Sequence, residues 1–376
     1  ESDQNFNRLN LMGKYNFEMK NADRITILVS KLQSKWDASG QIPQRLVDDG
    51  TITRFGAVDD TEGGNTSRTN IAVNHSRVLQ EDLLLKTNLF YSKYEFELFS
   101  NFTFFLEDPI NGDQIRQYED RSIYGLNTTL FQSSSINNID LDLSYNIGFR
   151  YDDVNDVELS RTRNRRETLE RLAFGDVDEL NGYVFLSGNY KSKKWTLNPG
   201  LRLDYFKFNY VDFLADSFET LGEDQMILSP KFNTIFAASS DLQLFAKLGY
   251  GFHSNDARVV TANTGEETLP SAFGADLGAI FKPADRLVLN TALWTLFSEQ
   301  EFVYVGDAGI VEPSGKSKRY GVDFGFRYQI NDWLFVNSDV NYTIARSVDE
   351  PDGQDFIPLA PDFTSAGSIS VKDLKG

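Results

Sequence analysis

The sequence predicts an all-β protein: a transmembrane, antiparallel, up-and-down β-barrel. Three observations lead to this fold class. Apolar and polar residues alternate through most of the 376 residues, short and long connections follow one another in turn, and aromatic residues gather near strand ends. A period of two is the pattern of a β-strand with one apolar and one polar face. No uninterrupted apolar run exceeds four residues, so the sequence offers no transmembrane helix, which needs about 20.

Composition narrows the function classes. The chain has 37 basic and 55 acidic side chains, a net charge of −18, which argues against binding a nucleic-acid backbone. Cysteine is absent, which excludes disulfides, thiolate metal sites and cysteine nucleophiles. The only histidines are His75 and His253, too few for most histidine-based metal or catalytic clusters. Mean hydropathy is −0.38 although 13% of the residues are aromatic, and this combination requires an explanation.

The clearest strand runs from Ile139 to Asp152, where seven apolar residues alternate with seven polar or small ones. The same alternation recurs at 195–205, 242–250 and 319–328. Extended along the chain, the pattern predicts about fifteen strands, at 5–19, 24–36, 67–77, 83–107, 115–131, 139–152, 181–190, 195–212, 226–238, 242–252, 269–281, 286–305, 315–330, 333–347 and 360–371.

The connections between these strands alternate in length. Short turns are expected at 20–23, 78–82, 133–138, 191–194, 239–241, 282–285 and 331–332. Long loops are expected at 37–66, 108–114, 153–180, 213–225, 253–268, 306–314 and 348–359. An up-and-down sheet places all tight turns at one end and all long loops at the other. A soluble sandwich or a lipocalin-like barrel also alternates, but sandwich strands average five or six residues, whereas most strands here have ten to seventeen.

Aromatic residues fall near both ends of the predicted strands. Trp195, Tyr328 and Trp333 lie near the short turns, and a second set lies toward the long loops: Trp36, Tyr151, Tyr205 and Tyr320. Girdles of amphipathic rings flank the lipid-facing band of transmembrane barrels. The opposite faces of the strands would then line a wet lumen with Asp142, Arg202, Asp204, Asp323 and Arg327.

Four groups of segments carry a resemblance to a known family: 36–45 with 61–68, 228–231 with 249–258, 267–271, and 306–315. They resemble the TonB-dependent outer-membrane receptors, in particular an iron-uptake-like branch seen in Bacteroidetes-type bacteria. Asn255 stands where members of the family usually carry proline. The segments span most of the chain, so the resemblance covers it broadly.

The resemblance implies a 22-stranded barrel in the outer membrane of a Gram-negative bacterium, filled by an N-terminal plug that carries a TonB box. It also implies import of a scarce nutrient such as a ferric siderophore, with the TonB complex, outer-membrane lipid and lipopolysaccharide as partners. Because no plug sequence precedes Glu1 and no terminal aromatic residue follows Val371, we expect residues 1–376 to be one β-barrel domain fragment. The N-terminal plug and the C-terminal strands would be absent from it.

A basic island at 158–172 is the first candidate site. It places five arginines in the predicted outer loop 153–180, with room for one helical turn: Arg161, Arg163, Arg165, Arg166 and Arg171. Guanidinium groups can capture an anionic ligand such as a ferric siderophore by charge and bidentate hydrogen bonds. The alternatives are contact with lipopolysaccharide phosphates, or pairing with Glu158, Glu167 and Glu170.

The second candidate site is a rim loop stabilised by His253 beside Asp256 and Arg258. The pairs His75-Ser76 and His253-Ser254 raise the possibility of a hydrolase, but neighbouring residues on a strand point to opposite faces. We therefore predict no catalytic residue, no metal site and no cofactor. The other functions considered are a passive porin-like channel and a non-transporting surface adhesin.

Overall fold

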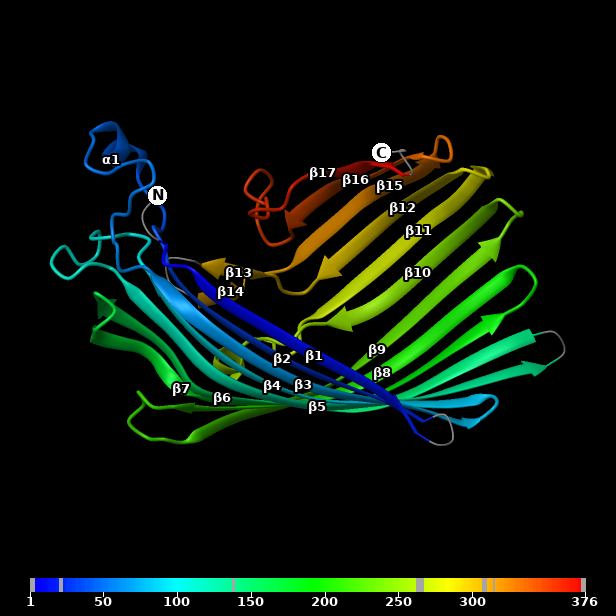
Figure 1. The fold of residues 1–376 in the computed structure, drawn as a ribbon, viewed down its shortest axis with the longest axis horizontal. Coiled ribbons are helices and arrows are strands. Elements are labelled where there is room, and N and C mark those ends of the chain that lie inside the picture. Colours follow the sequence, from blue (N-terminus) through cyan, green and yellow to red (C-terminus); the bar gives the residue numbers. More distant parts are fainter. Residues whose placement is uncertain are drawn as a thin grey trace.

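The computed structural model describes residues 4–19, 23–136, 139–261, 267–305, 310–313 and 315–372. It contains one antiparallel sheet whose fifteen strands are neighbours in sequence order, and a separate two-stranded hairpin (Figure 1). The first strands of the sheet are β1 (Asn7–Glu18), β2 (Arg24–Asp37), β3 (Gly63–Gln80), β4 (Leu83–Ser100), β5 (Ile115–Ile136), β6 (Ile139–Arg163), β7 (Glu167–Lys191) and β8 (Trp195–Asp212). The sheet continues through β9 (Thr220–Ala237), β10 (Leu242–Phe252), β11 (Ser271–Ala284), β12 (Leu287–Ser298), β15 (Ser317–Gln329), β16 (Leu334–Ser347) and β17 (Phe363–Val371). The hairpin consists of β13 (Phe302–Val305) and β14 (Ile310–Pro313).

The sheet curls so that β10 to β17 lie opposite β1 to β7 across a concave interior (Figure 1). Among the described residues, β1 pairs only with β2 and β17 pairs only with β16. The predicted all-β, antiparallel, up-and-down class is confirmed.

Alternation sorts the side chains onto two faces, as β8 illustrates. Leu201 and Leu203 lie on the convex face and are 46% and 39% exposed, while Asp204, one residue further, is fully buried. Asp204 accepts hydrogen bonds from Arg202 at 2.7 Å and from Asn181 at 3.0 Å. Apolar side chains on the outside and paired charges on the inside are what a wall between lipid and water requires. This arrangement explains an aromatic-rich chain with a negative mean hydropathy.

An aromatic row on the convex face supports the predicted girdle on the long-loop side. Tyr151 stacks on Tyr124 with ring centroids 6.4 Å apart, and Tyr124 lies 5.1 Å from Tyr91 on the next strand. At the short-turn end, Trp195 packs on Phe236 at 4.6 Å. Both ends of the wall therefore carry rings at the positions where transmembrane barrels carry them.

Each predicted strand corresponds to one strand of the sheet, but several boundaries are wrong. The predicted free loop 153–180 is mostly strand, since β6 continues to Arg163 and β7 begins at Glu167, and its proposed helical turn is absent. Pairing survives there through register shifts after Val154, Leu159 and Arg161. Because each bulge inserts an unpaired residue, the period-two pattern disappears from the sequence although the strand continues.

Other boundaries shift in the same region of the molecule. The strand predicted at 83–107 ends at Ser100, and the one predicted at 286–305 divides into β12 and β13. Parts of four predicted connections, 20–22, 137–138, 262–266 and 306–309, lie outside the described residues, as does the chain end from 373. The quoted segment 306–315 is therefore described only in part.

Two helices occur in the described part of the chain, α1 (Gln44–Asp48) and α2 (Ala257–Thr261), and both lie in long connections. Neither is long and apolar enough to cross a membrane.

Candidate functional site

The connection after β10 folds into the concave interior and carries α2 with it. Phe206 and Phe208 project inward from β8, on the same face as Asp204, and pack against Ala257, Val260 and Leu269. Phe208 is fully buried, and its ring stacks on Phe206 at 5.7 Å. This apolar cluster anchors the loop to the inner wall, so α2 lies inside the curl of the sheet.

Asp256 and Arg258 form a pair at the start of α2. The Arg258 guanidinium donates from Nη2 to Asp256 Oδ2 at 2.6 Å and from Nε to Oδ1 at 2.9 Å, and its backbone N–H donates to Oδ1 at 2.8 Å. Burial raises the pKa of the Asp256 carboxyl, but the hydrogen bonds from Arg258 outweigh it and hold that pKa below its usual value. The carboxylate is therefore charged at neutral pH and keeps Arg258 oriented.

Charged residues of β5 and β6 face α2 from the inner wall. Arg150 donates to Asp152 at 2.6 Å, and Arg121 donates to the same carboxylate at 3.4 Å and to Glu119 at 3.1 Å. Arg121 is close enough to Asp256 to lower the pKa of that carboxyl. We call this set the vestibule cluster: Glu119, Arg121, Arg150, Asp152, Asp256 and Arg258.

The vestibule cluster can bind an anion. Arg121 and Arg150 share the Asp152 carboxylate, and Arg258 is paired with Asp256, whose carboxyl is affected by the Arg121 charge, so a carboxylate fixes the direction of each guanidinium. A planar guanidinium offers several donors at once, so it can keep its internal partner and still hydrogen-bond to carboxylate or phenolate oxygens of a ligand. Sequence reasoning found Asp256 and Arg258 but missed the β5 and β6 residues. The sequence feature that could have indicated these residues is their position: each faces inward near the end of a predicted strand that adjoins a long loop.

His253, the third predicted rim residue, lies at the start of the same connection. Its Nε2 is 3.0 Å from the carbonyl oxygen of Gln300, so it ties this loop to the segment after β12. The three predicted rim residues thus lie in one loop, on the inner side of the sheet. Their role in ligand binding stays a prediction.

The basic island occupies the tip of the β6–β7 hairpin, and most of it is engaged within the protein. Arg161 donates to Glu107 at 2.9 Å, Arg163 bonds to Asn111 and Glu167, and Arg171 lies 3.6 Å from Glu158. Arg166 is exposed and forms no ion pair among the described residues. Pairing within the protein, one of the alternatives above, therefore describes these contacts, and capture of a ligand by them stays a prediction.

Arg165 has a different role from its neighbours in the island. Its guanidinium bonds to the backbone carbonyls of Thr61 and Glu62, lies 2.8 Å from Asp37, and is centred 5.8 Å from the Phe99 ring. It therefore joins the hairpin tip to the first long loop. Nothing in the sequence indicated this contact, since it spans more than a hundred residues.

Glu62 lies buried at the same junction and is 4% exposed. One carboxylate oxygen accepts the backbone N–H of Asn101 at 3.2 Å, while the other has no hydrogen-bond partner among the described residues. Burial, with the neighbouring Asp59 charge, raises the pKa of Glu62 to about 7, although the Asn101 bond and the Arg165 charge oppose the shift. We call Glu62, Asp59, Asn101 and Arg165 the loop junction.

Comparison with known proteins identifies the family. The model of the family described as TonB dependent receptor-like, beta-barrel, matches residues 7–370. The chain belongs to this family. Its members are outer-membrane β-barrels of Gram-negative bacteria that act as transport receptors. A search of curated proteins gave no match.

Solved structures of TonB-dependent receptors share the fold. The unliganded ferric citrate transporter FecA superposes with a TM-score of 0.82 at 12% identity, covering 97% of this chain and 55% of that one. The siderophore receptor PiuA from Acinetobacter baumannii gives 0.73 at 14% identity over 98% and 62%. The ferric-catecholate import receptor Fiu from K12 E. coli gives 0.71 at 13% over 96% and 62%. This chain therefore spans about 55–62% of the length of these receptors, and the likeness establishes the fold.

Proposed function

We propose that this chain forms most of the barrel wall of an outer-membrane receptor that imports a ferric siderophore with energy supplied through TonB. The observation that carries the proposal is the vestibule cluster, which gathers three guanidinium groups inside a TonB-dependent receptor barrel. Ferric chelates of carboxylates, catecholates or hydroxamates present anionic oxygens, which suit such donors. The receptors described above include two whose names specify ferric citrate and ferric catecholate.

The domain organisation is part of the same proposal. We take residues 1–376 to be one barrel domain whose plug and remaining strands belong to other parts of the protein. The support is the fifteen-stranded sheet, in which β1 and β17 each have one neighbour among the described residues, and the coverage of 55–62% of the related chains. Strand edges of this length are normally paired in a native protein.

Binding would proceed in two stages. The ligand enters from the long-loop side and meets Arg121, Arg150 and Arg258 in the interior, where carboxylates already hold the three guanidinium groups in place. Movement of the plug, drawn by TonB, then opens the path along the polar inner wall. The chain's own residues bind and orient the ligand, and they supply no catalytic group, so we propose that the protein is not an enzyme. Contact with lipopolysaccharide stays a prediction.

Uptake measurements test this proposal. Cells producing the full-length protein should accumulate iron from at least one of ferric citrate, a ferric catecholate and a ferric hydroxamate, and cells lacking TonB should not. Cobalamin and glycans serve as controls for other ligand classes. Uptake that persists without TonB would favour the passive channel. Absence of uptake for every iron chelate, together with uptake of a control ligand, would refute the siderophore assignment.

Arg121→Gln isolates the contribution of the vestibule cluster. The substitution removes a charged donor that faces the ligand space, and we expect ligand affinity to fall about tenfold or more, as for loss of one charge-assisted hydrogen bond. Arg166→Gln, at the exposed hairpin tip, is the matched control and should leave affinity unchanged. Unchanged affinity in Arg121→Gln together with a loss in Arg166→Gln would show that the hairpin tip, and not the vestibule, contacts the ligand.

A further inference from the structure

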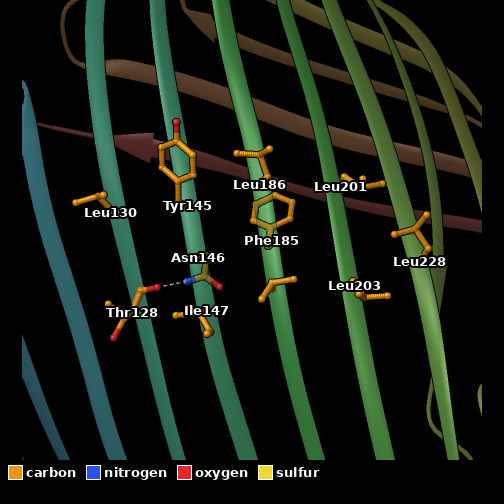
Figure 2. A pocket seen from close by; sticks show the side chains of 11 residues that line it. Thr128, Leu130, Tyr145, Asn146, Ile147, Phe185, Leu186, Leu201, Leu203 and Leu228 are labelled. Carbon is orange, nitrogen blue, oxygen red and sulfur yellow. Dashed lines mark hydrogen bonds between the residues drawn. The ribbon is translucent and has the colours of Figure 1, made fainter.

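The convex wall carries an apolar groove that the receptor function does not use. It has a volume of about 610 Å³ and crosses β5 to β9, where Tyr145, Ile147, Leu186, Leu201, Leu203 and Leu228 line it (Figure 2). Asn146, an amide at its edge, is already committed because it donates to the Thr128 carbonyl at 3.1 Å (Figure 2). The groove therefore offers mainly hydrocarbon contact, and the Thr128 and Tyr145 hydroxyls are further polar groups in its lining.

The wall below the groove ends at the β7–β8 turn, which has an unusual charge. Each of the other described short turns contains an acidic residue, at Asp82, Asp241, Asp285 and Asp332, whereas this turn contains Lys193 and Lys194 and no acid. Lys191 beside it is paired with Asp142 at 3.2 Å. Lys193 and Lys194 are exposed and form no ion pair within the described ranges. In a chain of net charge −18, this turn is a local positive site.

Aromatic side chains connect the turn to the groove. Lys194 Nζ lies 6.0 Å from the centroid of the Phe236 ring, and Phe236 packs on Trp195. Trp195 points to the same convex face as Leu201 and Leu203, since all three are odd-numbered residues of β8, and it is 47% exposed. The lysines of the turn, the Trp195 and Phe236 rings and the apolar groove therefore follow one another along the convex face.

The spacing of these features matches one membrane leaflet. Trp195 and Leu201 are six positions apart, which is about 20 Å at roughly 3.3 Å per residue. Strands of such barrels tilt by about 40°, so this length corresponds to a depth of about 15 Å. Half of a bilayer's hydrocarbon core is also about 15 Å thick. A lipid whose phosphate meets the lysines would place its chains in the groove.

We propose that this face binds a single anionic phospholipid from the leaflet at the short-turn rim. Lys193 and Lys194 bind its phosphate, Trp195 and Phe236 contact the glycerol region, and the groove accepts an acyl chain. The inference rests on the membrane placement within the proposed function, and it is independent of which ligand the receptor imports.

Native mass spectrometry of the full-length protein in detergent tests the inference. The probes are phosphatidylglycerol and phosphatidylcholine with identical 16-carbon chains, and glycerol phosphate as the headgroup alone. Lysines near an anionic lipid surface contribute about fivefold each. We therefore expect phosphatidylglycerol to bind about 25-fold more tightly than phosphatidylcholine, and we expect K193Q/K194Q to abolish that preference. Glycerol phosphate should bind far more weakly than either lipid.

The control variant K282Q/K372Q removes two positive charges from the same rim, away from the groove, and should keep the preference. Leu201→Trp fills the groove with a larger, mostly apolar ring, and it should weaken the binding of both lipids by about fourfold for each methylene it displaces. Equal binding of the two lipids to the unmodified protein would overturn the proposal. So would equal losses in the two lysine variants, or unchanged binding in Leu201→Trp. Because each variant is first checked for normal iron uptake, failure of lipid binding is distinguishable from failure of the receptor function.

Discussion

At the scale of single residues, what decides the role of an arginine is its surroundings. Arg165 and Arg166 are neighbours in one basic run, yet Arg165 holds the first long loop through two carbonyls and Asp37, while Arg166 is exposed. Both are arginines in the same basic run, so the sequence alone predicts the same role for them, contact with an anionic ligand. Contacts between residues more than a hundred positions apart separate them.

Arg165→Met should loosen the loop junction. The substitution leaves two carbonyls and Asp37 without their charged donor, which costs about 2 kcal/mol for partly buried groups. Opening of loop 38–62 would then become about 30-fold more frequent. Limited proteolysis of this loop in the full-length protein measures the change, and Arg166→Met should match the unmodified rate. Equal cleavage of both variants would contradict the assigned contact.

Glu62 should make the loop junction sensitive to pH. Because its pKa is raised from 4.5 to about 7 by burial, the closed junction retains the proton longer than the open one does. The stabilising contribution is fully present below about pH 4.5, falls as the pH rises, and is lost above about pH 7. Hydrogen exchange of the Asn101 amide, corrected for intrinsic rates, should show protection falling over this window. In Glu62→Gln the dependence should vanish, and protection that rises with pH would contradict the account.

At the scale of elements, the β6–β7 hairpin and α2 show where sequence patterns stop being informative. Below Tyr151 one face of β6 is apolar and the other is polar, so alternation is strict and the strand was predicted correctly. Above it both faces meet water or protein, and bulges break the period, so the same strand was taken for a loop. For α2, five residues are too few to show a helical period, and its position depends on Phe206 and Phe208 from another strand.

Phe208→Ala should release α2 from the inner wall. The ring is fully buried against the α2 loop, and removing it costs about 3 kcal/mol of local packing. Amides of 257–261 should then exchange faster, and ligand affinity should fall because Arg258 loses its fixed position. Phe218→Ala, which truncates a ring that is 71% exposed, is the control. Unchanged exchange in Phe208→Ala would show that α2 is held by other contacts.

At the scale of the whole molecule, the sequence specified the order and faces of the wall but not its interior. Strands such as β8 and β15 could be predicted because apolar residues occupy every second position, the pattern of a transmembrane barrel strand. The vestibule cluster could not, since Arg121 and Asp256 meet only through the curl of the sheet and the folding of a long loop inward. The five arginines of the basic island could be recognised because they are clustered in the sequence, whereas Arg150 and Asp152 are single charges on a regular strand.

If this wall separates lipid from a charged interior, oxygen accessibility along β8 should differ between its two faces. Residues 1–376 contain no cysteine, so single cysteines at positions 197, 198, 201, 202 and 203 of β8 can be spin-labelled within outer membranes, once any cysteine elsewhere in the full-length protein has been replaced. We expect labels at 197, 201 and 203 to collide mainly with oxygen dissolved in lipid, and those at 198 and 202 not to do so. A period of two in oxygen accessibility is the expected result. Equal accessibility at odd and even positions, or access of a polar relaxation agent to 201 and 203, would show that the odd-numbered face of β8 does not lie in lipid.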